Sequence, residues 1–204
     1  MPIRAIVLDI GSVLEIIDDS TFPEPFERRR GLGPGAVDAA SAAFPAHPGK
    51  GEIGMDEVRA TWQRELGLDD AGVEELVEDF WRWYVGTLDR ELFDWFAGLR
   101  ERGFLVGILS NSAPGARERE RCWGFEAITD DIVYSHEVGL VKPEPEIYAL
   151  TARRLAVRPE EIVFLDDQPG HVAAARAAGW HAVVHVETPR SIEEIEAILA
   201  AHSG

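Results

Sequence analysis

Short apolar segments separated by helical patterns define the fold that the sequence predicts. Five segments rich in valine, isoleucine and leucine are bounded by turn residues, as expected of buried strands: residues 3–8, 104–109, 132–134, 162–165 and 182–186. Most intervals between them carry apolar residues at helical spacing. Strands that alternate with helices are typical of an α/β protein whose parallel sheet is buried on both faces. We therefore expect a Rossmann-like α/β core around a parallel sheet.

The interval after the first strand has a different pattern. It contains no strand pattern, and four stretches have helical spacing: residues 23–30, 34–44, 55–66 and 70–83. We expect these helices to form an inserted helical cap over one end of the sheet, with Gly86 and Thr87 as a hinge. The predicted cap is residues 16–85, and the predicted α/β core is residues 1–15 and 86–204.

Two helical patterns carry more specific expectations. Apolar residues from Val73 to Tyr84 repeat at helical spacing, so the aromatic residues around Trp81 and Trp83 are expected in the cap core rather than around a substrate. The last helix is expected over residues 191–200, because Ser191 and Glu194 have the spacing of a capping box.

Composition adds expectations about domain count and location. The chain has 204 residues, 46% of them hydrophobic, which is enough for one domain with a modest insertion and a core of its own. A single cysteine, Cys122, excludes an internal disulfide framework and suits a reducing compartment. There is no signal-peptide pattern and no apolar run of membrane-spanning length. We therefore expect a cytoplasmic monomer or homodimer with no membrane partner.

Charge narrows the expected partners. Lysine and arginine total 20 against 37 aspartates and glutamates, and the resulting net charge of -17 repels nucleic acid phosphates. The negative charge of a phosphorylated ligand would need to be offset locally by a metal ion, by backbone amides or by one of the two lysines, Lys50 and Lys142. The segment around Lys50 is not a phosphate-binding loop, because Phe44 and Gly51 replace the first glycine and the final Ser or Thr of that motif.

Polar residues gather where the predicted strands end. Ligands of open parallel sheets bind outside the carboxyl ends of the strands, so residues that follow the strands can share one site. Six residues stand at such positions or in the loop before Pro143: Asp9, Ser110, Asn111, Lys142, Asp166 and Asp167. Together they offer a nucleophile, hard oxygen ligands for magnesium and a cation for an anionic group.

Each of these residues also has a purely structural interpretation. Asp9 and the Asp166–Asp167 pair could be turn or helix-cap residues, Ser110 could cap a helix, and Lys142 could be a solvated surface lysine. Their coincidence at one sheet edge favours a site, because carboxylates that converge without a cation would cost stability.

Four segments, taken in order, resemble the motifs of the haloacid dehalogenase-like hydrolase superfamily, in the branch with a helical cap. They are Leu8-Asp9-Ile10-Gly11-Ser12-Val13-Leu14, Leu109-Ser110-Asn111-Ser112, Val141-Lys142-Pro143 and Phe164-Leu165-Asp166-Asp167. The likeness covers nearly the whole chain. It implies a magnesium-dependent hydrolase of phosphoric monoesters, acting on a small phosphorylated metabolite such as a sugar phosphate.

The resemblance also implies roles for the matching residues. Asp9 would attack phosphorus to give a phospho-aspartyl intermediate. Ser110 and the Asn111 amide would bind the phosphoryl oxygens, and Lys142 would hold Asp9 and neutralise the phosphoryl charge. Mg²⁺ would be held by four residues: Asp9, the backbone carbonyl of Gly11, Asp166 and Asp167. These roles agree with the need of phosphoryl transfer for positioning and charge neutralisation.

Two residues depart from the usual family pattern. Phosphatases of the superfamily usually carry a general-acid aspartate where this chain has Gly11, although members similar to α-glucose-1-phosphate phosphatase also have glycine there. The residue His171 stands where most members have Asp or Asn. We interpret it as a helix-terminal residue, with a neutral partner of Ser110 or Lys142 as the alternative.

Two other functions stay open at this point. A hydrolytic 2-haloacid dehalogenase needs no acid at Gly11, but it has no use for the paired carboxylates Asp166 and Asp167. A catalytically impaired binding or regulatory protein is the second alternative. The presence of both Asp9 and Lys142 argues against the loss of catalytic residues that such a protein would show.

Overall fold

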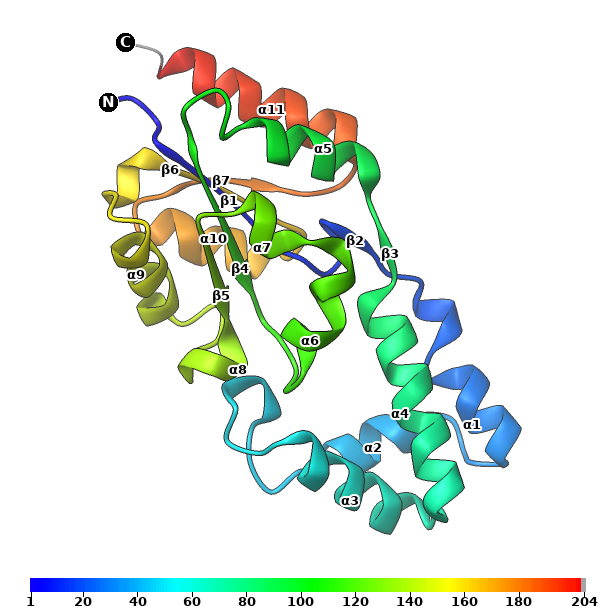
Figure 1. Cartoon of the computed structure of the whole chain (residues 1–204). Helices are drawn as coiled ribbons and strands as arrows, with labels where there is room; N and C mark the ends of the chain where they lie inside the picture. Colours follow the sequence, from blue (N-terminus) through cyan, green and yellow to red (C-terminus); the bar gives the residue numbers. More distant parts are fainter. Residues whose placement is uncertain (203–204) are drawn as a thin grey trace.

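A five-stranded parallel sheet forms the centre of the computed structural model, which describes residues 1–202. The strands lie in the order β5-β4-β1-β6-β7, and every neighbouring pair is parallel (Figure 1). Their bounds are Ala5–Leu8 for β1, Leu105–Ser110 for β4, Asp131–Tyr134 for β5, Ile162–Asp166 for β6 and His181–Val184 for β7. The predicted α/β core with a parallel sheet is therefore confirmed.

Side chains of β1 alternate between two hydrophobic cores, one on each face of the sheet. Ile6 and Leu8 belong to one core, and Ala5 and Val7 to the other; all four are fully buried. Helices α5 (Arg90–Gly98) and α11 (Thr188–Ala201) cover the first face, and α9 (Pro145–Arg154) and α10 (Pro169–Ala177) the second. This burial on both faces explains why the strands read as continuous apolar runs.

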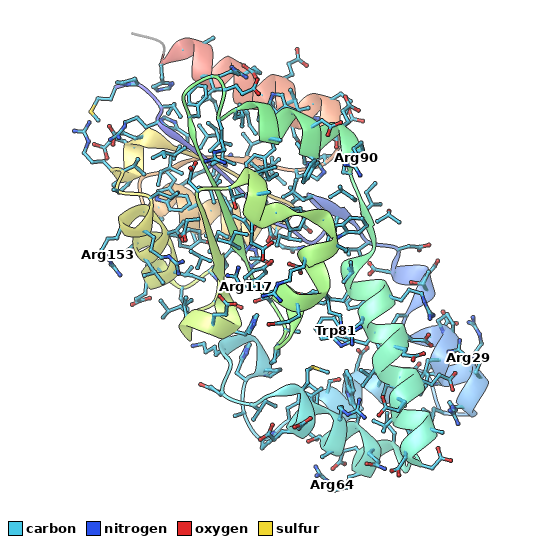
Figure 2. All side chains as sticks on the ribbon, in the orientation of Figure 1. Arg29, Arg64, Trp81, Arg90, Arg117 and Arg153 are labelled. Carbon is cyan, nitrogen blue, oxygen red and sulfur yellow. The ribbon has the colours of Figure 1, made fainter. Side chains whose placement is uncertain are left out.

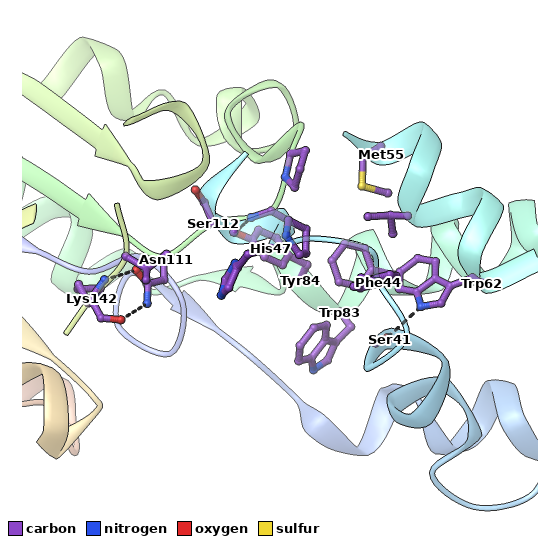
Figure 3. Close-up of a pocket in the computed structure, with 17 residues that line it drawn as sticks. Ser41, Phe44, His47, Met55, Trp62, Trp83, Tyr84, Asn111, Ser112 and Lys142 are labelled. Carbon is purple, nitrogen blue, oxygen red and sulfur yellow. Dashed lines mark hydrogen bonds between the residues drawn. The ribbon is translucent and has the colours of Figure 1, made fainter. Parts of the chain in front are cut away.

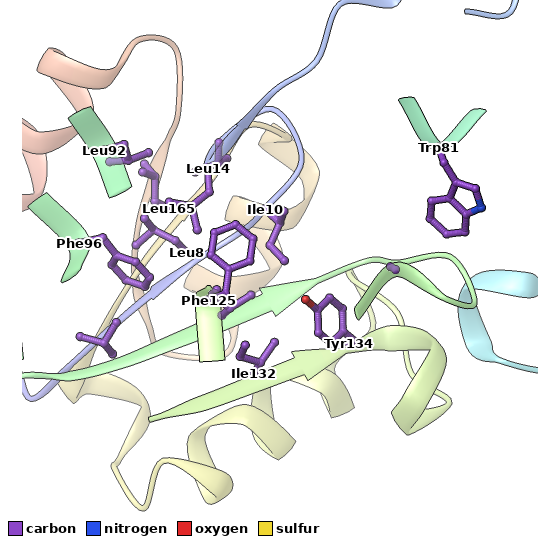
Figure 4. Packing of buried hydrophobic residues seen from close by; sticks show 14 of the residues in the cluster. Leu8, Ile10, Leu14, Trp81, Leu92, Phe96, Phe125, Ile132, Tyr134 and Leu165 are labelled. Carbon is purple, nitrogen blue, oxygen red and sulfur yellow. The ribbon is translucent and has the colours of Figure 1, made fainter. Parts of the chain in front are cut away.

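The first core continues from the sheet toward the site. Leu8, Leu165 and Phe96 pack together with Phe125 of the short helix α7 (Phe125–Ile128) (Figure 4). Ile10 and Leu14, which follow β1, are buried in the same cluster. The loop after β1 is thus anchored on both sides of Gly11, and this anchoring fixes the backbone at the sheet edge.

Four helices lie beyond the carboxyl ends of the strands (Figure 1). They are α1 (Glu24–Arg30), α2 (Ala36–Ser41), α3 (Met55–Leu66) and α4 (Asp70–Val85). These are the helices that we expected between residues 16 and 85. The division of the chain into a cap and a core at residues 15 and 86 stays a prediction.

The two connections to these helices pair as an antiparallel ribbon that the sequence did not reveal. It consists of β2 (Glu15–Ile16) and β3 (Thr87–Leu88). Gly86 precedes β3 with φ of +54°, and a Cβ there would lie 2.3 Å from the Ile16 carbonyl oxygen. The glycine that we assigned to a hinge therefore permits a close approach of the two connections.

Contacts between the four helices and the sheet region come from two places. The short 3₁₀ helix Pro48–Lys50 lies against α8 (Ser135–Val138), where Ser135 Oγ donates to the Gly49 carbonyl at 2.6 Å. On the other side, Trp81 of α4 points toward α6 (Ala116–Glu120) (Figure 2). The guanidinium carbon of Arg119 lies over the Trp81 ring, 5.3 Å from the ring centroid. Both contacts hold the helices over the sheet edge.

The C-terminal helix α11 differs from the prediction. It begins at Thr188, and the Ser191 backbone N–H already donates to the Glu187 carbonyl. The Ser191 hydroxyl contacts His185 Nδ1 at 2.9 Å, so the predicted capping box is wrong. Pro189 near the helix start favours the earlier beginning, because proline suits the first turn of a helix. Across residues 1–202, no helix is both long and apolar enough to span a membrane.

Candidate active site

Asp9 follows β1 and lies at the buried centre of the site. Its side chain is 10% exposed; Oδ1 accepts from the Ile10 backbone N–H at 2.8 Å, and Oδ2 lies 2.8 Å from Lys142 Nζ. Burial raises the pKa of Asp9 to about 7, and the Lys142 ammonium opposes that rise. A cation beside Asp9 would therefore favour the ionised, nucleophilic form.

Lys142 joins two carboxylates in the interior. Its ammonium lies 2.8 Å from Asp9 Oδ2 and 2.6 Å from Asp166 Oδ2, and its side chain is completely buried. The interpretation of Lys142 as a solvated surface lysine is therefore wrong. A buried ammonium between two carboxylates compensates charges that would be costly to bury alone.

Asp166 ends β6 and is held from three sides. Besides Lys142, it contacts His171 Nδ1 at 3.0 Å through Oδ1, and Oδ1 also accepts from the Gln168 backbone N–H at 2.8 Å. Burial alone would raise the pKa of Asp166, but the contacts with His171 and Lys142 lower it to about 2. These contacts favour the ionised form of Asp166 at neutral pH.

His171 has a role that the sequence analysis missed. It lies in the first turn of α10 and its ring contacts Asp166, rather than Ser110 or Lys142, among the described residues. Its predicted place at the helix start is confirmed, and the contact with Asp166 is an addition that the sequence did not show. Ligand atoms of Asp9, Asp166 and His171 all lie within 4.8 Å of one another.

Ser110 ends β4 and Asn111 follows it, beside this cluster. Asn111 Nδ2 donates to the Lys142 carbonyl at 2.9 Å, and its Oδ1 accepts from the Lys142 backbone N–H at 2.8 Å. These two hydrogen bonds fix the Lys142 backbone, and they use both polar atoms of the Asn111 side chain. Ser110 is buried, and its hydroxyl has a long contact of 3.4 Å to the Asn111 carbonyl.

Asp167 stands apart from the tight cluster. It is partly exposed, and its Oδ2 accepts from Gln168 Nε2 at 2.6 Å. It lines a cavity of about 330 Å³ together with Asp9 and Gly11. The four predicted magnesium ligands thus lie around one region. Asp9 and Asp166 contact Lys142, and Asp9, Gly11 and Asp167 line the cavity.

The donor set of this cavity suits a hard divalent cation. Six further residues on its wall bring hydroxyl or carboxyl oxygens: Ser12, Glu15, Asp19, Tyr84, Ser110 and Glu120. No lysine or arginine is among its lining residues within residues 1–202. Mg²⁺ prefers hard oxygen ligands with one or more carboxylates among them, so the residues fit that ion.

Two buried glutamates of the same cavity were missed in the sequence. Glu15 Oε1 accepts from Trp123 Nε1 at 2.8 Å, and Glu120 Oε2 accepts from the Tyr134 hydroxyl at 2.6 Å. The second oxygens, Glu15 Oε2 and Glu120 Oε1, are buried without a hydrogen-bond partner in the described part of the chain. The one available signal was the position of Glu15 within an otherwise apolar run.

Both glutamates bind protons more strongly in the folded protein than ordinary glutamates do. Burial, reinforced by the charge of Glu120, raises the pKa of Glu15 to about 9. Burial also raises the pKa of Glu120 to about 8; the Tyr134 hydroxyl opposes this rise and the charge of Asp9 adds to it. Arg117 and Glu126 also act on Glu120, with opposite signs.

These shifts predict how stability depends on pH. The glutamates ionise near 4.5 when unfolded and near 8 to 9 when folded, so the folded chain holds more protons in between. Stability should therefore fall as pH rises through that window. The double variant Glu15→Gln, Glu120→Gln should show a weaker fall, measured as the free energy of unfolding in denaturant at several pH values without metal. An equal slope in both proteins would contradict the assignment.

Sequence comparison gives one family. Residues 3–179 match a family model described as haloacid dehalogenase-like hydrolase. A phosphatase of Mycobacterium tuberculosis is 28% identical over 196 residues, which cover 89% of this chain and 87% of that protein. Hexitol phosphatase A of Escherichia coli is 35% identical over 95 residues, or 45% of this chain and 43% of that protein. The rat bifunctional epoxide hydrolase is 26% identical over 117 residues, and the match spans 55% of this chain but only 21% of that enzyme.

Solved structures share the same fold. A predicted HAD-like hydrolase from Porphyromonas gingivalis superposes with a TM-score of 0.76 at 24% identity, over 98% of both chains. A HAD family enzyme from Bacteroides thetaiotaomicron, in complex with magnesium and inorganic phosphate, has a TM-score of 0.71 at 21% identity. That match covers 90% of this chain and 94% of the other.

Proposed function

Because this chain belongs to the haloacid dehalogenase-like hydrolase family, we propose that it is a magnesium-dependent phosphatase of a small phosphorylated metabolite. The observation that carries the proposal is the position of Asp9. Its carboxylate is buried at the carboxyl edge of the sheet, 2.8 Å from Lys142, and faces an oxygen-lined cavity. Relatives named as phosphatases support the reaction type.

The chain's own residues account for the steps of the reaction. Asp9 Oδ attacks phosphorus, the bond from phosphorus to the leaving oxygen breaks, and the phosphoryl group is carried on Asp9. Water then attacks the same phosphorus, which releases inorganic phosphate and restores the carboxylate. Ser110 and the backbone N–H of Asn111 would donate to the phosphoryl oxygens, because the Asn111 side chain is occupied by Lys142. The Lys142 ammonium offsets negative charge at Asp9 and the phosphoryl group.

Magnesium, when bound, would neutralise charge on the phosphoryl oxygens. Asp9, the Gly11 carbonyl, Asp166 and Asp167 would hold it. Asp166 is also bonded to Lys142 and His171, which keep its carboxylate ionised and oriented. The magnesium-bound structure from Bacteroides thetaiotaomicron has the same fold and supports this assignment.

Magnesium dependence is the direct test of the proposal. We expect phosphate release from a panel of phosphorylated metabolites and an aryl phosphate to stop in excess chelator and to return with added Mg²⁺. Phosphate release is measured with Asp9→Asn as the blank. Undiminished turnover in chelator would remove the metal from the mechanism. Release of halide from a 2-haloacid without phosphatase activity would establish the dehalogenase alternative.

Gly11 predicts a preference among leaving groups. A positioned general acid typically contributes about 10²–10⁴-fold, and glycine cannot supply a proton. We therefore expect a high ratio of aryl to alkyl phosphate turnover. A Cβ built at Gly11 meets nothing within 4 Å, so the backbone there admits a side chain, and a Gly11→Asp protein that places its carboxyl beside the leaving oxygen should show a lower ratio. Equal rates for both classes in the unaltered protein would show that another group donates the proton.

A further inference from the structure

A second cavity of about 410 Å³, called the aromatic cavity below, lies beside the site; its walls are mainly apolar and include five aromatic rings (Figure 3). The rings come from the helical block of residues 16–85: Phe44, Trp62, Phe80, Trp83 and Tyr84. Met55 and Val58 of α3 add apolar surface. We had expected the aromatic residues of α4 only in the cap core. Phe80 does pack edge-on against Trp62, but both also line this cavity.

This cavity adjoins the one at Asp9. Trp83, Tyr84 and Asn111 line both cavities. Lys142 lines the aromatic cavity as well, while its Nζ lies 2.8 Å from Asp9 Oδ2. Figure 3 shows Lys142 and Asn111 at one end of the cavity and Trp62 at the other. A phosphoryl group on Asp9 would thus leave the rest of a substrate at the mouth of the aromatic cavity.

Most polar side chains of the aromatic cavity are hydrogen-bonded within the protein; the exposed His47 also lines the cavity and has no side-chain hydrogen bond in the described part of the chain. Ser41 Oγ donates to the Val37 carbonyl and accepts from Trp62 Nε1 at 2.9 Å. Trp83 Nε1 donates to Asp19 at 3.0 Å. These bonds leave the aromatic ring faces as the main surface of the wall.

Ser112 and Asn111, at the other end, are bonded in the same way. Ser112 Oγ lies 2.6 Å from His136 Nδ1, and the Asn111 amide is paired with the Lys142 backbone. Tyr84 Oη accepts from the Ala113 backbone N–H at 3.3 Å. The groups left to bond a ligand are therefore few, chiefly the His47 imidazole and the Tyr84 O–H, which does not suit a ligand that carries many hydroxyls.

We propose that the substrate is a phosphate monoester of an alcohol that carries an aromatic group, which occupies this cavity. The inference rests on the proposed phosphatase activity and names its substrate class. Aromatic rings stack favourably on such walls, whereas each polyol hydroxyl left without a partner would lose its hydrogen bonds to water without replacement. A cavity of about 150 Å³ accommodates benzene, so the larger space here admits a bicyclic ring.

The test compares two primary-alcohol monoesters, so that leaving-group chemistry is matched. We expect kcat/KM for naphthylethyl phosphate to exceed that for a hexitol phosphate at least about tenfold, the scale on which apolar pockets discriminate. Equal values or a preference for the hexitol ester would overturn this inference alone. Absence of phosphate release from these and all other monoesters would overturn the proposed function, and this inference with it.

Variants of the cavity wall give a second test. Phe44→Ala removes a ring and Met55→Trp fills space, and each should lower the ratio of naphthylethyl to hexitol turnover at least several-fold. Phe104→Ala is the matched control, because Phe104 is also a partly buried phenylalanine but precedes β4 at the opposite end of the strand from Ser110. Thermal unfolding checks that each variant is folded. An unchanged ratio in folded Phe44→Ala and Met55→Trp would overturn the inference.

Discussion

We expect Asp9→Asn to abolish phosphate release while the protein stays folded. The amide keeps the shape of the side chain but cannot attack phosphorus, so the loss should be on the order of 10⁴-fold or more. Folding should persist, because Lys142 keeps its 2.6 Å contact with Asp166. Steady-state phosphate release and thermal unfolding measure the two effects.

An exposed aspartate provides the control for this variant. Asp94 is exposed on α5 and lines neither of the two cavities at the site, so Asp94→Asn should leave turnover unchanged. A folded Asp9→Asn protein that retains much of its activity would contradict the nucleophile assignment. Loss of folding in Asp9→Asn would show instead that the Asp9 carboxylate is required for structure.

We expect Lys142→Met to cause a large loss of stability as well as of activity. Methionine has a similar length but no charge, so Asp9 and Asp166 would face each other in the interior without a cation. Breaking a buried ion pair on one side typically costs about 3–5 kcal/mol. The free energy of unfolding, measured in denaturant and chelator, should fall by about that amount.

The other lysine of the chain is the matched control. Lys50 also forms an ion pair, with Glu144 at 2.5 Å, but both side chains are partly exposed. Exposed pairs contribute little to stability, so Lys50→Met should change the unfolding free energy far less than Lys142→Met. Similar small changes in both variants would contradict the buried role of Lys142.

The sheet and its edge residues could be predicted because their signals are local. Each strand is a short apolar run, and parallel strands bring their carboxyl ends to the same edge of the sheet. The sequence alone therefore predicts that Asp9, Ser110 and Asp166 lie at one edge. The structure then showed that Lys142 reaches two of these residues at once. That contact depends on a loop path, which periodicity does not specify.

Other features depend on contacts between distant segments. Glu15 begins β2 and Glu120 ends α6, yet both line one cavity, and neither has a motif of its own. The β2–β3 ribbon has two residues in each strand, which is too short for a period to show. Helical spacing marked Phe80 as buried but could not show that one side of its ring faces a cavity.

The most direct test of the account is the chemical state of Asp9 during turnover. The enzyme is mixed with an aryl phosphate and Mg²⁺, quenched in acid and digested, and the peptides are analysed by mass spectrometry. We predict a phosphoryl group on Asp9, absent in the Asp9→Asn protein. A phosphoryl group on another residue, an ester between Asp9 and substrate carbon, or an unmodified Asp9 during measured turnover would contradict the account.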